Sequence, residues 1–255
     1  MKVCIGYKCD IGTTKKVNQD AILIKCANTI KGKVCMLAVC DGMGGLSQGE
    51  LASTTVILEL SKWFERYLPQ IIVKDTYENE IKESILKILN SVNIRIKEYG
   101  ENKDIKLGTT LSLLLVINNV YYIYNIGDSR TYIINESVNQ ITKDQSYVQR
   151  EVDLGRLTTE QARCHPKRNI LLQCIGVSEN IEIDSYTGNV KEGTAFLLCS
   201  DGFCHEIKND EMLEIFAVNE FIDDDMLTTK CSDIVEKIKL RGEKDNISVI
   251  AAKFI

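Results

Sequence analysis

The chain is organised around residues 34–45, VCMLAVCDGMGG, in which seven apolar residues end in Asp41 and three glycines follow within four positions. The length of the apolar run predicts a strand that is buried on both faces. The glycines allow a tight turn and leave the backbone carbonyls uncovered. A carboxylate beside bare carbonyl oxygens is typical of a hard-cation site. The alternative is an ordinary turn, because most Asp-Gly pairs do no more than reverse the chain.

Composition narrows the class of protein. The chain has 255 residues, 44% hydrophobic and 26% charged, with a net charge of −5. These values are typical of a globular domain and give no reason to expect nucleic-acid binding. No apolar stretch approaches the roughly 20 residues that span a bilayer, and the first residues lack the apolar core of a signal peptide. We therefore expect a cytoplasmic protein that does not act in a membrane.

The chain has ten cysteines but only two histidines, His165 and His205, and no Cys-x-x-Cys pair. This spacing argues against a zinc cluster. Most of the cysteines lie within apolar runs, where a thiol acts as a small hydrophobe. Reduced thiols are favoured over disulfides in a cytoplasmic chain of this size.

Hydrophobic periodicity predicts alternating blocks of strands and helices. The predicted helices cover about 47–68, 79–99, 209–218 and 224–240; the first begins with the capping box Ser47–Glu50, and Gly100 is the expected terminator of the second. The predicted strands cover 3–10, 21–26, 34–40, 109–117, 120–126, 131–134, 170–176, 181–187, 194–200 and the segment that ends at Phe254. Neighbouring strands are often adjacent in sequence, so antiparallel pairing is expected. No linker or repeat is present, and one domain over 1–255 is predicted.

Five aspartates share one position relative to the predicted strands: each lies at a strand boundary beside small or turn-forming residues. They are Asp20, Asp41, Asp128, Asp201 and Asp245. Each alone is best explained as a solvated turn carboxylate. Together they suggest one cluster, which would repel itself unless cations neutralised it. An all-oxygen cluster suits Mg²⁺ or Mn²⁺.

Six motifs occur in the order seen in the metal-dependent type 2C protein serine/threonine phosphatases. They are Asn18-Gln19-Asp20, Asp41-Gly42-Met43-Gly44-Gly45, Gly108-Thr109-Thr110, Gly127-Asp128-Ser129-Arg130, Ser200-Asp201-Gly202 and Asp245-Asn246-Ile247-Ser248. The chain resembles this family, in its bacterial form, from about residue 5 to residue 254. The region 143–170, with Gly155-Arg156-Leu157-Thr158 and His165-Pro166, resembles the small flap subdomain of the bacterial members.

The resemblance implies an α+β fold, an α-β-β-α sandwich of two central antiparallel sheets flanked by helices, with the metal site at one edge. It also implies two Mn²⁺ or Mg²⁺ ions and a third, weaker position. Asp41 would bridge the two ions, and the Gly42 carbonyl would serve the second. Asp201 and Asp245 would hold the first, which Asp20 would support through water. Asp128 would join Asp201 at the third position.

The implied reaction is hydrolysis of phosphoserine or phosphothreonine by direct attack of a metal-bridging hydroxide. Asp41, Asp20 and Lys15 are the predicted catalytic residues. Lys15, where the family usually has an arginine, and its neighbour Lys16 are the predicted phosphate-binding residues. The expected partners are phosphorylated proteins and a cognate serine/threonine kinase, and a monomer is expected. The alternative is a catalytically weak or silent relative that binds phosphoproteins as a regulator.

Several positions depart from the family pattern. Lysine at position 15 offers a point charge in place of the planar fork of arginine. Gln19 stands where many members have a glutamate that contacts the second metal, so looser binding of that ion is expected. Met43 replaces a histidine of eukaryotic relatives, and Gln145 replaces another histidine. His165 is predicted to be a packing residue of the flap.

Overall fold

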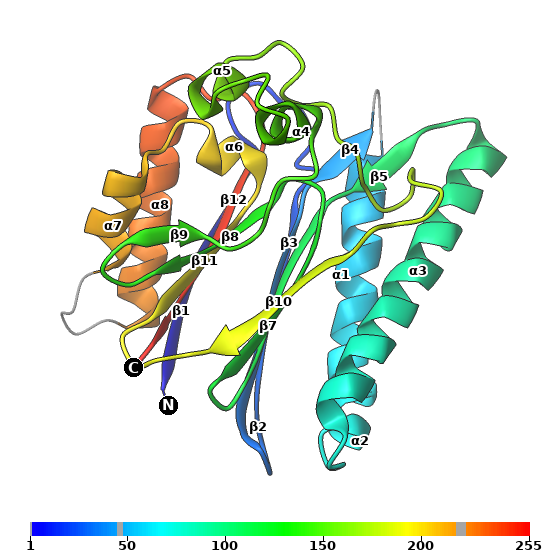
Figure 1. Cartoon of the computed structure of the whole chain (residues 1–255), viewed down its shortest axis with the longest axis vertical. Coiled ribbons are helices and arrows are strands. Elements are labelled where there is room, and N and C mark those ends of the chain that lie inside the picture. The colour runs from blue at the N-terminus through cyan, green and yellow to red at the C-terminus, as the bar shows by residue number, and fades with distance from the viewer. Residues whose placement is uncertain (1, 45–47, 218–222) are drawn as a thin grey trace.

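Two five-stranded antiparallel sheets pack face to face, and helices cover both outer faces (Figure 1). The computed structural model describes residues 2–44, 48–217 and 223–255. Sheet A has the order β1-β12-β11-β8-β9, sheet B has the order β10-β7-β6-β3-β2, and β4 pairs with β5 in a small third sheet. The strands are β1 Val3–Asp10, β2 Ala21–Thr29, β3 Gly32–Cys40, β4 Gly42–Gly44, β5 Leu107–Thr109, β6 Leu111–Ile117, β7 Val120–Ile126, β8 Arg130–Ile134, β9 Val138–Gln140, β10 Asp184–Asn189, β11 Ala195–Cys199 and β12 Ile247–Phe254.

The helices form the two outer layers and the region above the sheet edges. Helices α1 (Gly49–Arg66), α2 (Leu68–Ile71) and α3 (Tyr77–Lys103) lie against sheet B, and α7 (Asn209–Phe216) and α8 (Asp224–Leu240) lie against sheet A. The short helices α4 (Tyr147–Asp153), α5 (Thr159–Arg163) and α6 (Asp201–Cys204) lie at one end of the sandwich (Figure 1). The first and last strands are neighbours in sheet A, because Val3 is paired with Phe254.

Strand β3 contributes to two hydrophobic layers at once. Met36 and Ala38 face the helices over sheet B, whereas Leu37 and Val39 face the other sheet. All seven residues from 34 to 40 are buried, as the continuous apolar run predicted. A strand with this pattern must lie inside the sheet, and β3 has β2 and β6 on its two sides.

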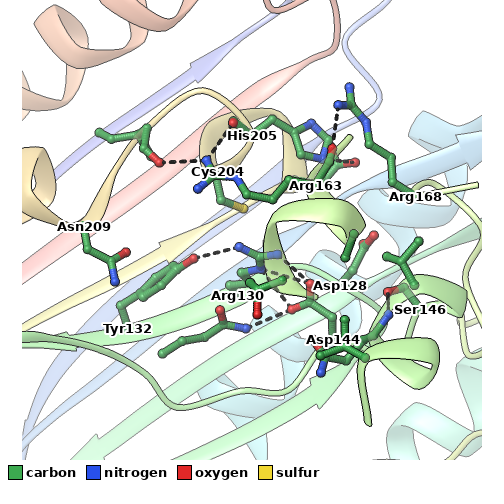
Figure 2. Close-up of a pocket in the computed structure, with 18 of the residues that line it drawn as sticks. Asp128, Arg130, Tyr132, Asp144, Ser146, Arg163, Arg168, Cys204, His205 and Asn209 are labelled. Carbon is green, nitrogen blue, oxygen red and sulfur yellow. Dashed lines mark hydrogen bonds and ion pairs between the residues drawn. The ribbon is translucent and has the colours of Figure 1, made fainter. Parts of the chain in front are cut away.

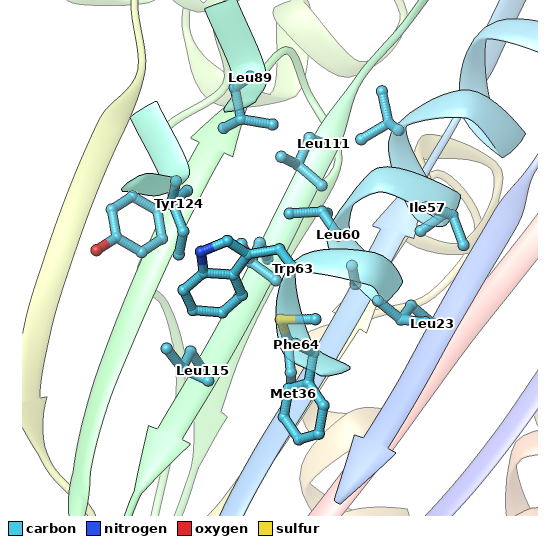
Figure 3. Packing of buried hydrophobic residues seen from close by; sticks show 14 of the residues in the cluster. Leu23, Met36, Ile57, Leu60, Trp63, Phe64, Leu89, Leu111, Leu115 and Tyr124 are labelled. Atoms are coloured by element: carbon cyan, nitrogen blue, oxygen red, sulfur yellow. The ribbon is translucent and has the colours of Figure 1, made fainter. Parts of the chain in front are cut away.

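The layer between sheet B and its helices is filled by large side chains (Figure 3). Trp63 of α1 is 1% exposed, and its indole N–H donates to the Ser84 hydroxyl of α3 over 3.0 Å. This hydrogen bond satisfies the polar atom of a buried aromatic side chain and joins the two long helices. The layer fixes α1 behind the ends of β2 and β3, where the candidate site lies.

The predicted α+β sandwich of two antiparallel sheets is confirmed. The prediction that Gly100 ends the second helix is wrong, because α3 continues to Lys103 and ends at Asp104, whose φ is 52°. Gly100 has a different role: a Cβ there would lie 2.7 Å from the Ile105 carbonyl oxygen, where the chain turns back.

Two further predictions concern local elements. The strand predicted over 170–176 is absent, since Leu171 and Ile175 form only isolated bridges with Ser146 and Thr109. The capping box of α1 depends on Ser47, which lies outside the described residues. Within the described ranges, no helix is long and apolar enough to cross a membrane.

Candidate metal and phosphate site

The register of sheet B places the first two aspartates together. Strands β2 and β3 are antiparallel, and Ala21 is paired with Cys40. Asp20 immediately precedes this pair and Asp41 immediately follows it. The two carboxylates therefore leave the same end of one ladder.

The register of sheet A places the other three at the same edge. Cys199, at the end of β11, is paired with the first residue of β8 and with β12. Asp128 lies just before β8, Asp201 just after β11, and Asp245 just before β12. Antiparallel pairing thus converts five distant sequence positions into one rim.

Four of the five aspartates line one cavity of about 290 Å³: Asp41, Asp128, Asp201 and Asp245. The rest of its wall is formed by Lys15, Gln19, Gly42, Met43, Thr110, Asn169 and Leu171. Asp20 lies behind this wall, 7% exposed, and its Oδ2 accepts a hydrogen bond of 2.9 Å from the Ser200 hydroxyl. Lys16 is exposed and does not line the cavity.

The backbone around Asp41 is held rigidly. Its N–H donates to the Thr110 hydroxyl over 2.9 Å, and its carbonyl accepts from the Thr110 N–H over 2.9 Å and from the Thr109 hydroxyl over 3.0 Å. Since the backbone groups are satisfied by β5 and its neighbour, the carboxylate is left to line the cavity. A stiff support of this kind is what a bridging ligand requires.

Position 42 requires glycine because two other backbone segments approach it closely. A Cβ at this position would lie 2.3 Å from the Gly49 carbonyl oxygen and 2.4 Å from the Gln19 carbonyl oxygen. The Gly42 N–H also donates to the Gln19 carbonyl over 3.1 Å. Any side chain would separate β4 from the start of α1, so glycine keeps this part of the wall in place.

The clustered carboxylates disfavour their own ionised forms. Burial, and then the charges of Asp20 and Asp201, raise the pKa of Asp41 well above its usual value. Burial, and then the charge of Asp201, raise the pKa of Asp128 in the same direction. For Asp20, burial outweighs the hydrogen bonds from two serines and raises the pKa to about 7. The rim therefore needs positive charge to be fully ionised near neutral pH.

The donor set fits hard cations. Within the described residues, Asp20 Oδ1 and Asp201 Oδ1 are buried and have no hydrogen-bond partner. Buried carboxylate oxygens without a partner are costly unless a cation meets them. Yet no three histidine, cysteine, aspartate or glutamate side chains in the described ranges converge closely enough to form a ready cage. Carboxylate oxygens whose remaining coordination positions are filled by water suit Mg²⁺ or Mn²⁺.

Lys15 supplies positive charge to the rim. Its Nζ lies 2.6 Å from Asp245 Oδ1, and its side chain is 39% exposed. Burial alone would lower the pKa of Lys15, but the hydrogen bond and charge of Asp245, and then the charge of Asp41, raise it overall. The ammonium group therefore occupies one of the two oxygens of a predicted metal ligand.

Gln19 lies between the cavity and α1. Its Nε2 donates to Glu50 Oε2 over 3.5 Å, and its backbone N–H donates to Asn246 Oδ1 over 2.9 Å. The side-chain amide is neutral, and the carboxylate that it contacts, Glu50, does not line the cavity. Gln19 lines the cavity together with Gly42, the predicted carbonyl ligand of the second ion.

The family model described as protein phosphatase 2C matches residues 12–235. The chain belongs to the protein phosphatase 2C family. It is 31% identical to protein phosphatase PhpP of Streptococcus pneumoniae over 251 residues, which cover 96% of this chain and 95% of PhpP. The crystal structure of serine/threonine phosphatase Stp1 from Staphylococcus aureus superposes with a TM-score of 0.86 at 26% identity, covering 100% of this chain and 96% of Stp1. The catalytic domain of serine/threonine protein phosphatase PstP, in complex with two manganese ions, superposes with a TM-score of 0.76 at 27% identity over 99% of both chains.

Two residues beside the rim of this 2C phosphatase were missed from the sequence. His205 lies between Glu243 and Asp201, with Nδ1 3.3 Å from Glu243 Oε2 and Nε2 3.8 Å from Asp201 Oδ2. Glu243 also accepts from the N–H groups of Lys244 and Asp245 over 2.6 and 2.9 Å, so it positions the loop that carries Asp245. The signals were weak: a histidine four residues after Asp201 and a glutamate two residues before Asp245.

The same pair has strongly shifted pKa values. Burial opposes the charged imidazole, but the hydrogen bond that His205 donates to Glu243 and the charge of Asp201 raise the pKa of His205 to about 9. Burial likewise opposes the carboxylate of Glu243, but His205 and the two backbone donors lower its pKa to about 2. The pair is therefore an ion pair at neutral pH.

A second cavity, of about 320 Å³, lies beneath the predicted flap and shares Asp128 and Asp201 with the first (Figure 2). Arg130 forms a bidentate ion pair with Asp144, at 2.9 Å from Nε to Oδ1 and 2.6 Å from Nη2 to Oδ2. Arg163 of α5 donates to the carbonyl of His205 over 3.0 Å. These contacts connect the 143–170 region to the sheet edge and to α6.

Gln145, another departure from the family pattern, and His165 both make local structural contacts. Gln145 accepts from the Gly127 N–H over 2.8 Å and donates its own N–H to the Gly127 carbonyl over 2.9 Å, which holds the turn before Asp128. His165 packs on Tyr147 with ring centroids 6.0 Å apart, and its Nδ1 accepts from the Lys167 N–H. His165 lines neither cavity.

Proposed function

We propose that the chain hydrolyses phosphoserine and phosphothreonine in proteins with the help of Mn²⁺ or Mg²⁺. The observation that carries this proposal is the convergence of Asp41, Asp128, Asp201 and Asp245 on one cavity that also holds a lysine ammonium. Phosphomonoester hydrolysis needs positive charge around the phosphoryl oxygens and a water molecule in line with the leaving oxygen. An acidic rim can supply that charge only by binding cations, so the carboxylates and the proposed reaction fit together.

In this proposal Asp41 and the Gly42 carbonyl, with Asp201 and Asp245, would hold two cations, while Asp128 and Asp201 would serve a third, weaker position. Bound cations would supply an activated water nucleophile and neutralise the phosphate. The three backbone hydrogen bonds of Asp41 to residues 109 and 110 support the proposal that its carboxylate would be shared by the two cations. Asp20 adds negative charge from behind the rim, with one oxygen held by Ser200 and the other without a partner among the described residues.

Lys15 is the proposed phosphate-binding residue. It lines the cavity, whereas Lys16 does not, so the role is assigned to Lys15. Lys15 is paired with Asp245, and a cation held by Asp245 would neutralise that carboxylate and leave the ammonium group free to bind a phosphoryl oxygen. A lysine can make this move because its four-carbon stem is flexible and its charge is compact.

The test is phosphate release from phosphothreonine, phosphoserine and phosphotyrosine peptides by protein stripped of metal, titrated with Mn²⁺ and separately with Mg²⁺. The proposal predicts no release without metal and preference for the first two peptides. The Lys15–Asp245 ion pair favours a second candidate, a phosphoprotein-binding regulator with little or no activity. Binding of a phosphothreonine peptide without any release at saturating Mn²⁺ would favour that regulator.

A further inference from the structure

Two cysteines face each other across the β2–β3 ladder. Cys26 is the direct partner of Cys35, and their Sγ atoms are 2.7 Å apart. Cys26 is exposed on β2, which forms one edge of sheet B, whereas Cys35 is 2% exposed and lies in the layer between the sheets. One thiol is thus open to solvent and the other is held directly beside it.

The backbone geometry of this pair suits a disulfide. Directly opposed residues of an antiparallel ladder have Cα atoms about 4.5–5.5 Å apart. A disulfide accepts Cα separations of about 4.4–6.8 Å, so the spacing of directly opposed residues falls within the range that a bridge requires. The tight turn between Thr29 and Gly32 fixes the register and keeps the two cysteines opposed.

Other thiols of the described residues lack this combination. Cys199 and Cys204 are 3.9 Å apart and both are buried; Cys204 lies in α6, so the two are not opposed residues of a strand ladder. Cys164 is exposed at the end of α5, outside any strand ladder. It is a natural control, because it shares the accessibility of Cys26 and lacks an opposed cysteine.

The exposed thiol, Cys26, is also the more reactive of the two. A hydrogen bond with Cys35, and then the charge of Lys33, lower the pKa of the Cys26 thiol. The hydrogen bond with Cys26, and then burial, raise the pKa of the Cys35 thiol. A thiolate attacks oxidants faster than a thiol, so Cys26 is the residue that reacts first.

We propose that Cys26 and Cys35 form an oxidisable thiol pair that peroxide converts into a reversible disulfide across β2 and β3. The Cys26 thiolate attacks one peroxide oxygen, the O–O bond breaks, and a sulfenic acid forms while the departing hydroxide takes up a proton as water. The Cys35 sulfur then attacks Cys26 Sγ; the S–O bond breaks, the thiol proton leaves with the hydroxide as a second water, and the S–S bond remains. Two thiols and one hydrogen peroxide give one disulfide and two waters, a two-electron oxidation of the sulfur pair. A dithiol reverses it by exchange.

The disulfide would link the two strands of the β2–β3 hairpin, which carries two residues of the proposed metal site. The same ladder ends at the Ala21–Cys40 pair, from which Asp20 and Asp41 emerge. Because β2 is an edge strand with one paired neighbour, its hydrogen bonds open more easily than those of a central strand. A covalent link to β3 is expected to slow that opening without displacing either aspartate.

The test treats the folded, metal-free protein with hydrogen peroxide, quenches with acid, alkylates the remaining thiols and maps the peptides by mass spectrometry. We expect a loss of about 2 Da, one for each thiol hydrogen, assigned to a Cys26–Cys35 link that dithiothreitol reverses. The Cys164→Ser variant should form the same link, and the Cys26→Ser variant should not. Hydrogen exchange of β2 amides should be slower in the oxidised protein.

Three outcomes would overturn the proposal. The first is Cys26 oxidised to sulfinic acid while Cys35 remains open to alkylation after unfolding. The second is a link that joins Cys26 to another cysteine, and the third is the same 2 Da loss in the Cys26→Ser variant. Because Cys26 is exposed on an edge strand, its serine variant should fold, and the near-ultraviolet circular dichroism spectrum verifies this.

Discussion

Replacing Asp20 by asparagine should stabilise the metal-free protein, although it removes a residue of the proposed site. The pKa of Asp20 rises from 3.8 to about 7 on folding. At about 1.4 kcal/mol per pKa unit, the ionised carboxylate costs on the order of 4 kcal/mol in the folded state at pH 7. Asparagine keeps an oxygen that can accept from the Ser200 hydroxyl but brings an amide nitrogen to the position of Oδ1, so we expect a net gain of about 1–3 kcal/mol.

The pH dependence gives the sign of this effect. The folded pKa lies above the unfolded one, so the folded protein binds the extra proton, and wild-type stability is lost as pH rises from about 4 to about 7. The gain of Asp20→Asn over wild type should therefore be small at pH 4 and grow toward pH 7. For a chain of this length, each kcal/mol moves Tm by about 2–4 °C.

The assay is thermal unfolding of both proteins in EDTA between pH 4.5 and 7.5, repeated with Mn²⁺. With Mn²⁺ at 100 times its Kd, the free energy of unfolding of wild type rises by about 2.7 kcal/mol. That of the variant rises less, so the stability difference between the two proteins becomes smaller. Asp10→Asn is the matched control: Asp10 is ion-paired with Lys8 and Lys239 and accepts from the Gly12 N–H, so its variant should be destabilised. If Asp20→Asn were destabilised in EDTA at pH 7 as Asp10→Asn is, the argument that burial makes the ionised Asp20 carboxylate unfavourable would be refuted.

Three other changes test neighbouring parts of the rim. Lys15→Ala should raise KM for a phosphorylated peptide and also tighten Mn²⁺ binding measured by calorimetry, because the ion pair that competes for a carboxylate oxygen is gone; unchanged values for both would exclude Lys15 from the site. Gln19→Glu should lower the Mn²⁺ concentration needed for activity yet lower Tm in EDTA, because it places a second carboxylate beside Glu50; equal Tm values would contradict the contact. Glu243→Gln should lower the free energy of unfolding by about 1–3 kcal/mol, measured by urea denaturation in EDTA between pH 5 and 6.5. In this range both Glu243 and His205 are charged in the unfolded state as well. Above that range the cost should decline as pH rises through about 9, the folded pKa of His205, and a cost independent of pH would exclude the ion pair.

Much of the fold could be predicted because local patterns agree with the tertiary structure. The run from 34 to 40 became a buried central strand, and α8 spans the predicted residues 224–240. The end of α3 could not be predicted from Gly100 alone, since that glycine serves a close approach of Ile105 rather than a cap. The segment 170–176 looks like a strand because Leu171 and Ile175 are apolar, but they line the cavity and the core without a continuous ladder.

The candidate site was predictable where residue type and strand ends coincide. Asp41, Asp128, Asp201 and Asp245 were found because each interrupts a strand pattern, and the antiparallel registers bring those interruptions to one edge. Contacts between distant loops leave no such signal. The pairing of Lys15 with Asp245 joins residues 230 positions apart in the sequence and depends on where two loops meet. The Cys26–Cys35 pair lies between these two cases. It is not marked by residue type, but a tight turn between Thr29 and Gly32 implies that the two cysteines are opposed.

The central claim is that the aspartate rim binds the cations on which phosphate-ester hydrolysis depends. Its most direct test measures Mn²⁺ binding by calorimetry and phosphate release from a phosphothreonine peptide in the same samples of wild type and Asp41→Asn. The account predicts that wild type binds at least two ions and releases phosphate only when they are bound. It predicts that Asp41→Asn, with its backbone still held by Thr109 and Thr110, loses tight binding and activity together. Near-normal turnover in Asp41→Asn, or full activity of wild type in EDTA, would contradict it.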